Sequence, residues 1–348
     1  MVVNMNRVRN TNIFFLGLVL FYILSCFFIV PNLPKSLLEG NWSIVLGQMI
    51  IAIPVIICLI IQKGKPLSYV SFKKIRISDY CLLFLFTMFI IPVITLINAI
   101  SMMFVENYLA TELDSMNTNP LILNLVLIAL IPAFVEEITF RGIIYGGYKE
   151  SKIKYAILGS SLLFGLFHMN VNQFCYAFVM AIIFGFLYEA TGSILSTIFV
   201  HFIFNSNSVV LQKLLYWYEQ LIYKLAENNE EYKELADQLK ESANETVTYA
   251  DMSIAEKIGT IVSLSIPAMI GAVVAVLLIS VIAKRNHRLV HVKKILYSFV
   301  GKEYVPKVAD ETDYIEEINE NKNGKVFDIV FIVSAVLCIA FMIFLEIG

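Results

Sequence analysis

The stretch LIALIPAFVEEITFRGIIYGG, residues 127–147, is apolar enough to cross a membrane as a helix, yet it carries two adjacent carboxylates and an arginine. An ionisable side chain at the centre of a membrane helix costs about 2.5–3.5 kcal/mol on insertion scales. Glu136, Glu137 and Arg141 are therefore expected to pair with one another or to face water inside the protein. Three charges in one apolar helix predict a polar site within a membrane bundle.

The composition of the whole chain is that of a polytopic membrane protein. Of its 348 residues, 58% are hydrophobic and 16% are charged, and the mean hydropathy is +0.76. Soluble domains carry about 25% charged residues. The formal net charge of −2 gives no indication of nucleic-acid binding. All five cysteines lie in apolar runs without C-x-x-C spacing, which favours small core side chains over a disulfide framework or a zinc site.

Nine apolar segments reach or approach the roughly 20 residues that a membrane-spanning helix needs. Lysine and arginine gather at the N-terminus and in three loops, which nine spans would place together on the cytoplasmic side. We therefore predict an all-α, polytopic transmembrane bundle of about eight to nine spans, in the plasma membrane, with a cytoplasmic N-terminus. The candidate spans are 13–30, 43–61, 80–104, 121–147, 155–170, 173–190, 194–212, 258–283 and 326–347.

These spans predict four parts of the chain. The N-terminal part, 1–119, holds about three helices, and a core, 120–212, carries the charged helix and the three helices after it. An acidic extracytoplasmic segment, 213–257, follows, and the C-terminal helices of 258–348 flank a cytoplasmic connector, 284–325.

The two water-exposed parts differ in their patterns. Apolar residues at helical spacing from Leu211 to Leu225 predict that the seventh span continues outward as an amphipathic helix on the membrane surface, within a segment that we interpret as a solvated cap. The connector begins basic and ends acidic, which predicts partial disorder. His287 and His291 lie in its basic part and are expected at the surface.

Spacing assigns different surroundings to the two glutamates. Glu137 and Arg141 are four residues apart, so they share a helix face and are able to form an ion pair. Glu136 is rotated by about 100° and points elsewhere. A glutamate without a strong partner in a dry site is able to shuttle a proton. Pro132 removes the backbone bond to the carbonyl of Ile128 and is expected to bend the helix.

Later spans add two histidines and an amide. The sequence FGLFH places Phe164 and His168 four residues apart, and HFIFN does the same for His201 and Asn205. A carboxylate, two imidazoles and an amide suit hydrolysis of a peptide bond. The carboxylate takes a proton from water, one imidazole holds that water, and the other imidazole and the amide stabilise the oxyanion.

Other hydrolytic chemistries are less well matched. Glu136, His168 and His201 form a set that is also able to hold a zinc ion, which would activate water. The H-E-x-x-H signature of zinc proteases is nevertheless absent. G-x-S-x-G and a convincing pair of aspartates are absent from the spans as well, which disfavours serine-type and aspartyl-type mechanisms.

The three motifs together resemble the CPBP family of CAAX proteases and bacteriocin-processing intramembrane endopeptidases, also called the Abi family. E-E-x-x-x-R, F-x-x-x-H and H-x-x-x-N occur in order on separate helices over roughly 120–210, and the turn TGSI at 191–194 is similar to the family as well.

The resemblance implies a helical membrane protease whose site opens to the membrane and the cytosol. It assigns the general base to Glu136, orientation of the water to His168, and the oxyanion hole to His201 and Asn205. Glu137 and Arg141 would be the supporting ion pair, and Phe164 would pack beside the site. We expect a mechanism that needs no metal, with zinc as the alternative cofactor.

One expectation conflicts with this arrangement. Glu136 lies towards the inner end of its predicted span, whereas His168 lies near the outer end of its own. At about 1.5 Å per residue these depths differ by about 10–15 Å. Either the predicted boundaries are shifted, or the turn MNVNQ, residues 169–173, dips into the membrane and lines a wet cavity. We expect the turn to contribute, because three of its five residues are Asn or Gln.

Two other functions stay open at the level of the sequence. A proton-coupled transporter or channel would use the same charged residues as an ion path, although no internal repeat is visible. A non-catalytic immunity protein would keep the pocket to bind a peptide toxin. For the endopeptidase, the expected partners are membrane lipid and a membrane-associated protein or peptide. Whether this substrate is prenylated, a peptide precursor, a pheromone or the tail of a membrane protein stays undecided.

Overall fold

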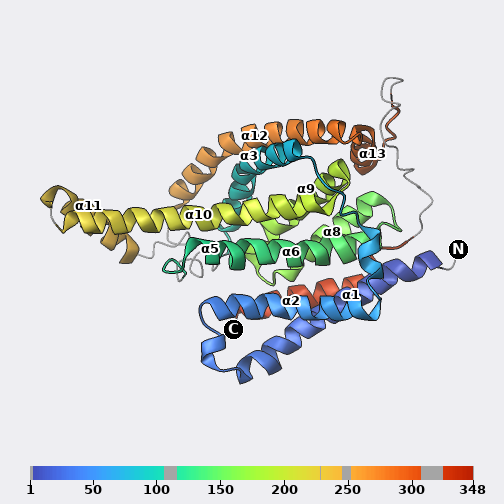
Figure 1. Cartoon of the computed structure of the whole chain (residues 1–348), viewed down its shortest axis with the longest axis horizontal. Helices are drawn as coiled ribbons and strands as arrows, with labels where there is room; N and C mark the ends of the chain where they lie inside the picture. Colours follow the sequence, from blue (N-terminus) through green and yellow to red (C-terminus); the bar gives the residue numbers. More distant parts are fainter. Residues whose placement is uncertain (1–2, 106–115, 228, 245–251, 307–323, 348) are drawn as a thin grey trace.

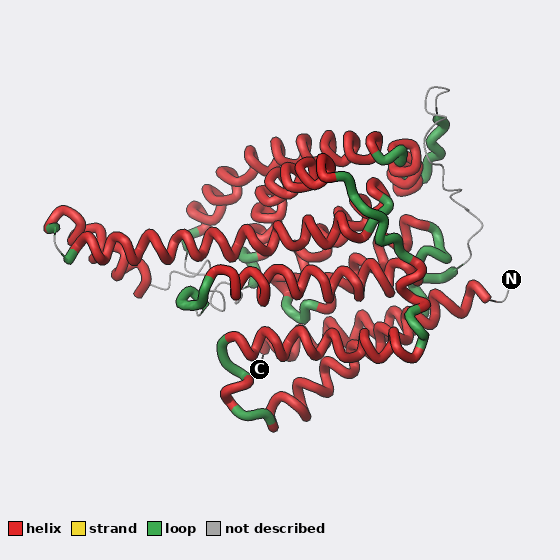
Figure 2. The backbone as a smooth tube through the Cα atoms, viewed as in Figure 1, coloured by secondary structure: helices red, strands yellow, loops and turns green. Residues whose placement is uncertain are grey.

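The structure is a computed structural model that describes residues 3–105, 116–227, 229–244, 252–306 and 324–347. Every regular element in these residues is a helix, and no strand occurs among them (Figure 2). The predicted all-α bundle is therefore confirmed.

Eight helical segments in the described part of the chain are long and apolar enough to cross a membrane, so the protein is a multi-pass integral membrane protein. The predicted span 155–170 departs from expectation. It is the helix α8 (Ile153–Phe167), which has 15 residues and a length of about 22 Å, less than the roughly 30 Å of a hydrocarbon core. The eight segments are Arg7–Asn32, Asn41–Ile61, Ile77–Ser101, Leu121–Tyr148, Val171–Thr191, Ile194–Ala226, Ile254–Arg285 and Ile329–Glu346.

The two ends of the chain pack together. Helices α1 (Val3–Leu24), α2 (Asn41–Ile61) and α14 (Ile329–Ile347) lie along one side of the bundle (Figure 1). The side-chain amide of Asn12 donates hydrogen bonds to the carbonyl of Val326 at 3.0 Å and to Asp328 Oδ1 at 2.8 Å. The first helix is thereby attached to the beginning of the last.

The helix that carries the charged residues is not a regular α-helix. It consists of α5 (Leu121–Asn124), the π-helical η5 (Leu125–Leu130), α6 (Ile131–Glu137), the π-helical η6 (Ile138–Tyr145) and α7 (Gly146–Tyr148). A π-helical turn is rare and occurs often at functional sites.

Proline explains one of the two irregular segments. Pro132 has no N–H to donate to the carbonyl of Ile128, and η5 ends at Leu130, just before this proline. Glu136 and Glu137 therefore stand on a short α-helical stretch between two wider turns.

The next three helices bring the other polar residues to this helix. They are α8, α9 (Val171–Thr191) and α10 (Ile194–Ala226). Asn170 caps the start of α9, where its Oδ1 accepts a hydrogen bond from the backbone N–H of Gln173 at 2.8 Å. At the end of α9, Gly192 has a left-handed φ of 68°, which suits glycine and turns the chain sharply into α10.

Helix α10 projects beyond the bundle. Its 33 residues span about 50 Å, so roughly 20 Å extends past a membrane core. The predicted continuation of the seventh span as a helix is confirmed, and α11 (Glu230–Asn244) folds back against it (Figure 1). That this continuation points outward and lies on the membrane surface stays a prediction. Ile222, Ala226 and Ala236 pack between the two helices.

The C-terminal part adds two more helices, α12 (Ile254–Arg285) and α13 (Leu289–Phe299). Helix α12 packs closely along α3 (Ile77–Ser101). At Gly271 the two helices are so close that an added Cβ would collide with the carbonyl of Phe89. Helix α13 lies across the end of α12 and was not predicted from the connector's sequence (Figure 1). Residues 307–323 of that connector, for which partial disorder was predicted, lie outside the described residues. The division of the chain into four parts stays a prediction.

Candidate active site

The carboxylate of Glu137 is the centre of a buried polar cluster. Arg141 Nη1 donates to its Oε1 at 2.9 Å, and His201 Nδ1 lies 3.1 Å from the same oxygen. Glu137 is 0% exposed, and Arg141 and His201 are each 3% exposed. The predicted ion pair of Glu137 and Arg141 therefore forms, and it includes a histidine from another helix.

Aromatic rings hold the guanidinium of Arg141 in place. Its Cζ lies 4.6 Å from the ring centroid of Phe164 and 5.0 Å from that of Phe184. Its Nη2 donates to the carbonyl of Ala181 at 3.4 Å. Cation–π contact is stronger in a desolvated site, so the rings stabilise the arginine in addition to Glu137.

Glu136 has a different environment from Glu137. Its side chain is 14% exposed, and its Oε2 lies 3.9 Å from Nε2 of His201. The two ring nitrogens of His201 therefore face two different carboxylates: Nδ1 faces Glu137 and Nε2 faces Glu136. Since Glu137 already binds Arg141, Glu136 is the carboxylate with access to a further molecule.

His168 contacts the ring of Phe164, which also lies beside this cluster. It follows the last residue of α8, and its Nδ1 lies 2.8 Å from the carbonyl of Phe164. Its ring is 4.9 Å from the ring of Phe164, which in turn is 6.2 Å from the ring of His201. A carbonyl oxygen accepts hydrogen bonds only, so this contact places the proton on Nδ1 and leaves the lone pair of Nε2 open.

The expected difference in depth between Glu136 and His168 becomes small. Along their helices, Glu136 is about 18 Å from Tyr148 and His168 is about 22 Å from Ile153, at about 1.5 Å per residue. The predicted gap of about 10–15 Å arose from treating segment 155–170 as a full span, whereas α8 is too short to cross a membrane core. Because α8 is short, a start of this helix at one edge of a membrane core would place the turn at Met169, whose φ is +50°, inside that core. That this turn lines a wet cavity stays a prediction.

Asn205 contacts the charged helix one turn further along α10. Its Nδ2 donates to the carbonyl of Ile128 at 3.4 Å. Asn205 is partly buried, and this bond holds its amide between α10 and the helix that carries Glu136. The structure therefore brings Glu136, Glu137, Arg141, Phe164 and His201 into one cluster, with His168 and Asn205 at its edges.

The alternative zinc set does not fit this arrangement. Among the described residues, no three His, Cys, Asp or Glu side chains gather as a metal ion requires, and Glu136, His168 and His201 are no such group. The Nδ1 atoms of both histidines face other acceptors, the carbonyl of Phe164 and the carboxylate of Glu137, so only their Nε2 atoms could bind a metal ion.

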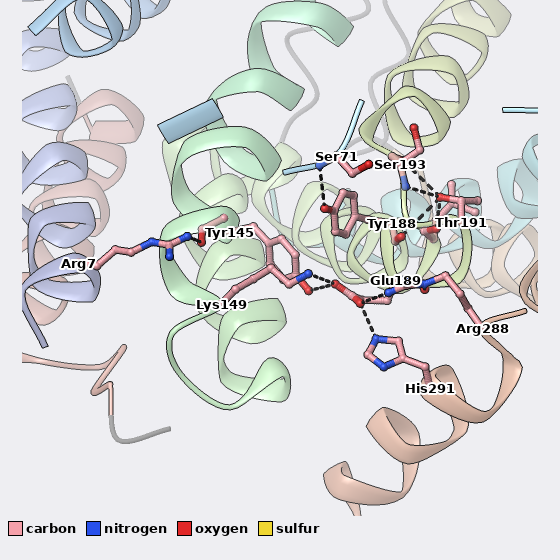
Figure 3. Close-up of polar contacts among 12 residues, drawn as sticks. Arg7, Ser71, Tyr145, Lys149, Tyr188, Glu189, Thr191, Ser193, Arg288 and His291 are labelled. Atoms are coloured by element: carbon pink, nitrogen blue, oxygen red, sulfur yellow. Dashed lines mark hydrogen bonds and ion pairs between the residues drawn. The ribbon is translucent and has the colours of Figure 1, made fainter. Parts of the chain in front are cut away.

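A second buried polar cluster surrounds Glu189, which the sequence analysis did not single out (Figure 3). Its carboxylate, 0% exposed, binds the hydroxyl of Tyr145 at 2.5 Å and the amino group of Lys149 at 3.2 Å. Arg288 Nη2 lies at 3.0 Å and His291 Nε2 at 2.6 Å. The expectation that His291 is a surface residue is wrong, because it is 0% exposed.

This Glu189 cluster joins parts of the chain that are far apart in sequence. Arg288 Nε also donates to the backbone carbonyl of Glu189 at 2.5 Å, and its side chain packs on Gly192 in the turn before α10. Helix α13 is thereby attached to the end of α9. In the sequence, Glu189 is a single acidic residue near the end of an apolar helix, and the basic segments that supply its partners lie elsewhere in the chain. One such residue is too weak a signal to indicate a partner.

Comparisons with known proteins match the central helices. Residues 118–207 match the family described as "Type II CAAX prenyl endopeptidase Rce1-like". The "Putative membrane peptidase YdiL" of Bacillus subtilis is 33% identical over 101 residues, which cover 29% of this chain and 41% of the relative. The matched part thus spans about two fifths of that relative's length. No solved structure matches. The resemblance of the three motifs to the CAAX-protease family is confirmed for this segment.

Proposed function

We propose, with the Rce1-like match of residues 118–207 as the premise, that the protein is an intramembrane endopeptidase. It would hydrolyse a peptide bond in a membrane-associated protein or peptide. The observation that carries the proposal is the position of His201 between two glutamates of unequal access: buried Glu137 at 3.1 Å and partly exposed Glu136 at 3.9 Å.

The first chemical step assigns roles to Glu136 and His168. His168 donates Nδ1–H to the carbonyl of Phe164, so its Nε2 accepts a hydrogen bond from water. Glu136 takes a proton from that water as the new bond forms between the water oxygen and the scissile carbonyl carbon. The carbonyl oxygen becomes an oxyanion, and Glu136 becomes a carboxylic acid.

The second step requires donors for that oxyanion. His201 in its imidazolium form donates Nδ1–H to Glu137 and keeps Nε2–H for the oxyanion. The amide of Asn205 has two N–H groups: one donates to Ile128, and the other serves the oxyanion. Glu136 then returns its proton to the amine nitrogen as the C–N bond breaks.

This mechanism needs no metal ion, and the same chemistry accepts more than one substrate class. A prenylated CAAX protein, a peptide precursor or the tail of a membrane protein would each present a peptide bond near the membrane. We place the protein in the plasma membrane with its N-terminus in the cytoplasm, because the basic loops gather on that side.

The test uses the purified full chain in lipid vesicles with two reporter peptides, one farnesylated at a C-terminal CAAX cysteine and one unprenylated. Glu136→Gln keeps the shape of the side chain and removes the base, so cleavage is expected to fall by about 10²–10⁴-fold. Cleavage that survives this change contradicts the proposed base. Proton or ion flux that depends on Glu136, without any cleavage, would favour a transporter instead.

A second measurement separates the two mechanisms. Purified protein is treated with a chelator, and its zinc content is determined by elemental analysis. Full cleavage without bound zinc is the expected result. Activity that disappears with the metal and returns when zinc is added would replace the glutamate mechanism with a zinc-dependent one.

A further inference from the structure

Lys213 is a buried cation at the outer part of α10, away from the candidate site. It is 6% exposed, and no carboxylate pairs with it among the residues that the structure describes. Its Nζ donates instead to two backbone carbonyls, those of Asn117 and Asn119, the latter at 2.8 Å. A buried ammonium is costly unless its N–H groups find acceptors, so these two hydrogen bonds offset the cost of its desolvation.

Its two acceptors are themselves fixed. Asn119 Nδ2 donates to Asn41 Oδ1 at 2.6 Å and to Asn124 Oδ1 at 3.0 Å, and Asn124 Nδ2 donates to the carbonyl of Met116 at 3.0 Å. The turn before α5 is therefore held by α2 on one side and by α5 on the other. Lys213 binds a rigid piece of backbone rather than a mobile side chain.

Lys213 is the outermost of three polar contacts between α10 and the helix that carries the glutamates. Further in, Asn205 donates to the carbonyl of Ile128 at 3.4 Å, and His201 contacts Glu137 at 3.1 Å. The two helices run in opposite directions, so these contacts form a ladder along their interface. Apolar packing alone tolerates small axial shifts, whereas a hydrogen bond to a fixed carbonyl does not.

We infer that Lys213 is a positioning residue, which sets the axial register of α10 against residues 117–148 and so places His201 and Asn205 opposite Glu136. The inference rests on the proposed endopeptidase function. A displacement of about 1 Å at reacting atoms lowers a rate by up to about 100-fold. Lys213 would thus control turnover from a distance without touching the substrate.

Three variants test this role. Lys213→Met removes the charge and keeps most of the stem, Lys213→Arg keeps a donor, and Lys224→Met makes the same charge change at an exposed position of the same helix. We expect Lys213→Met to lower kcat by about 10–100-fold with KM within about twofold. Lys213→Arg is expected to recover most of that loss, and Lys224→Met to match the wild type.

The register itself is measured by disulfide cross-linking, which needs no substrate. In a background with all five native cysteines replaced by alanine, Val209→Cys is combined in turn with a cysteine at Leu121, Leu125 or Ile128. These three positions lie about one turn apart on one face of the facing helix. Lys213→Met is expected to change which pair cross-links most, and Lys213→Arg is expected to keep the wild-type pattern.

An unchanged cross-linking pattern in Lys213→Met, or an unchanged kcat, overturns the inference. A wild-type protein that cleaves neither reporter peptide refutes the proposed function instead. In that case the cross-linking pattern alone still decides whether Lys213 sets the register.

Discussion

The side-chain amide of Asn205 donates to the carbonyl of Ile128, which is the carbonyl that Pro132 deprives of its α-helical donor. Pro132 therefore leaves the carbonyl of Ile128 as an available acceptor, and Asn205 of α10 donates a hydrogen bond to it at 3.4 Å. The proline leaves the carbonyl of Ile128 without its α-helical donor, and the asparagine donates to this carbonyl, which fixes the orientation of its own amide.

Replacing this proline tests the pairing. Pro132→Ala restores an N–H that competes with Asn205 for the carbonyl of Ile128. Thermal stability is expected to stay equal or to rise, because proline is about 3 kcal/mol less favourable than alanine inside a helix. Peptide cleavage is expected to fall about 10-fold, since the amide of Asn205 loses its fixed position. The control is Pro54→Ala, the same change within α2, a helix that carries none of the candidate site residues. Equal cleavage by both variants contradicts the pairing.

A substitution at Arg141 tests whether the site needs the planar geometry of the guanidinium in addition to its positive charge. Its guanidinium donates to Glu137 and Ala181 while it lies between the rings of Phe164 and Phe184. An ammonium lacks the planar fork that makes these contacts together. Arg141→Lys is therefore expected to lower the melting temperature and to reduce cleavage at least 10-fold, although the charge is kept. Differential scanning calorimetry and the peptide assay measure the two effects. Cleavage at the wild-type rate would show that charge alone suffices.

The two histidines are expected to respond differently to alanine. His201→Ala removes one partner of the buried carboxylate of Glu137 and opens a cavity beside Phe184, so both stability and cleavage fall. His168 is partly exposed at a helix end, so His168→Ala is expected to keep the melting temperature within a few degrees and to lose cleavage about 100-fold. A loss of stability as large as that of His201→Ala would assign His168 a structural role instead.

Local patterns predicted much of the candidate site. The spacing of Glu137 and Arg141 predicted their ion pair, and the 100° rotation of Glu136 predicted its separate environment. Both follow from the geometry of one helix, which the sequence encodes directly. The expected all-α bundle follows likewise from composition and from the length of the apolar runs.

Such local patterns could not predict contacts between segments that are distant in the sequence. The predicted segment 155–170 ends three residues beyond α8, which ends at Phe167, and the polar residues that follow from His168 gave no exact boundary. His291 looked like a surface residue because its neighbours are basic, yet it binds Glu189, 102 positions away in the sequence. Lys213 bonds to backbone carbonyls, and a carbonyl carries no residue type that a sequence pattern is able to reveal.

The Glu189 cluster predicts a large effect on stability from a small chemical change. Glu189→Gln replaces a buried carboxylate by a neutral amide and leaves Lys149, Arg288 and His291 without their common acceptor (Figure 3). Loss of one partner from a buried ionic group costs about 3–5 kcal/mol. The melting temperature is expected to fall, and α13, which this carboxylate holds, is expected to become more accessible to added protease. Glu227→Gln, at an exposed site just after α10, is the matched control. If both variants melt at the wild-type temperature, the cluster does not hold α13 in place.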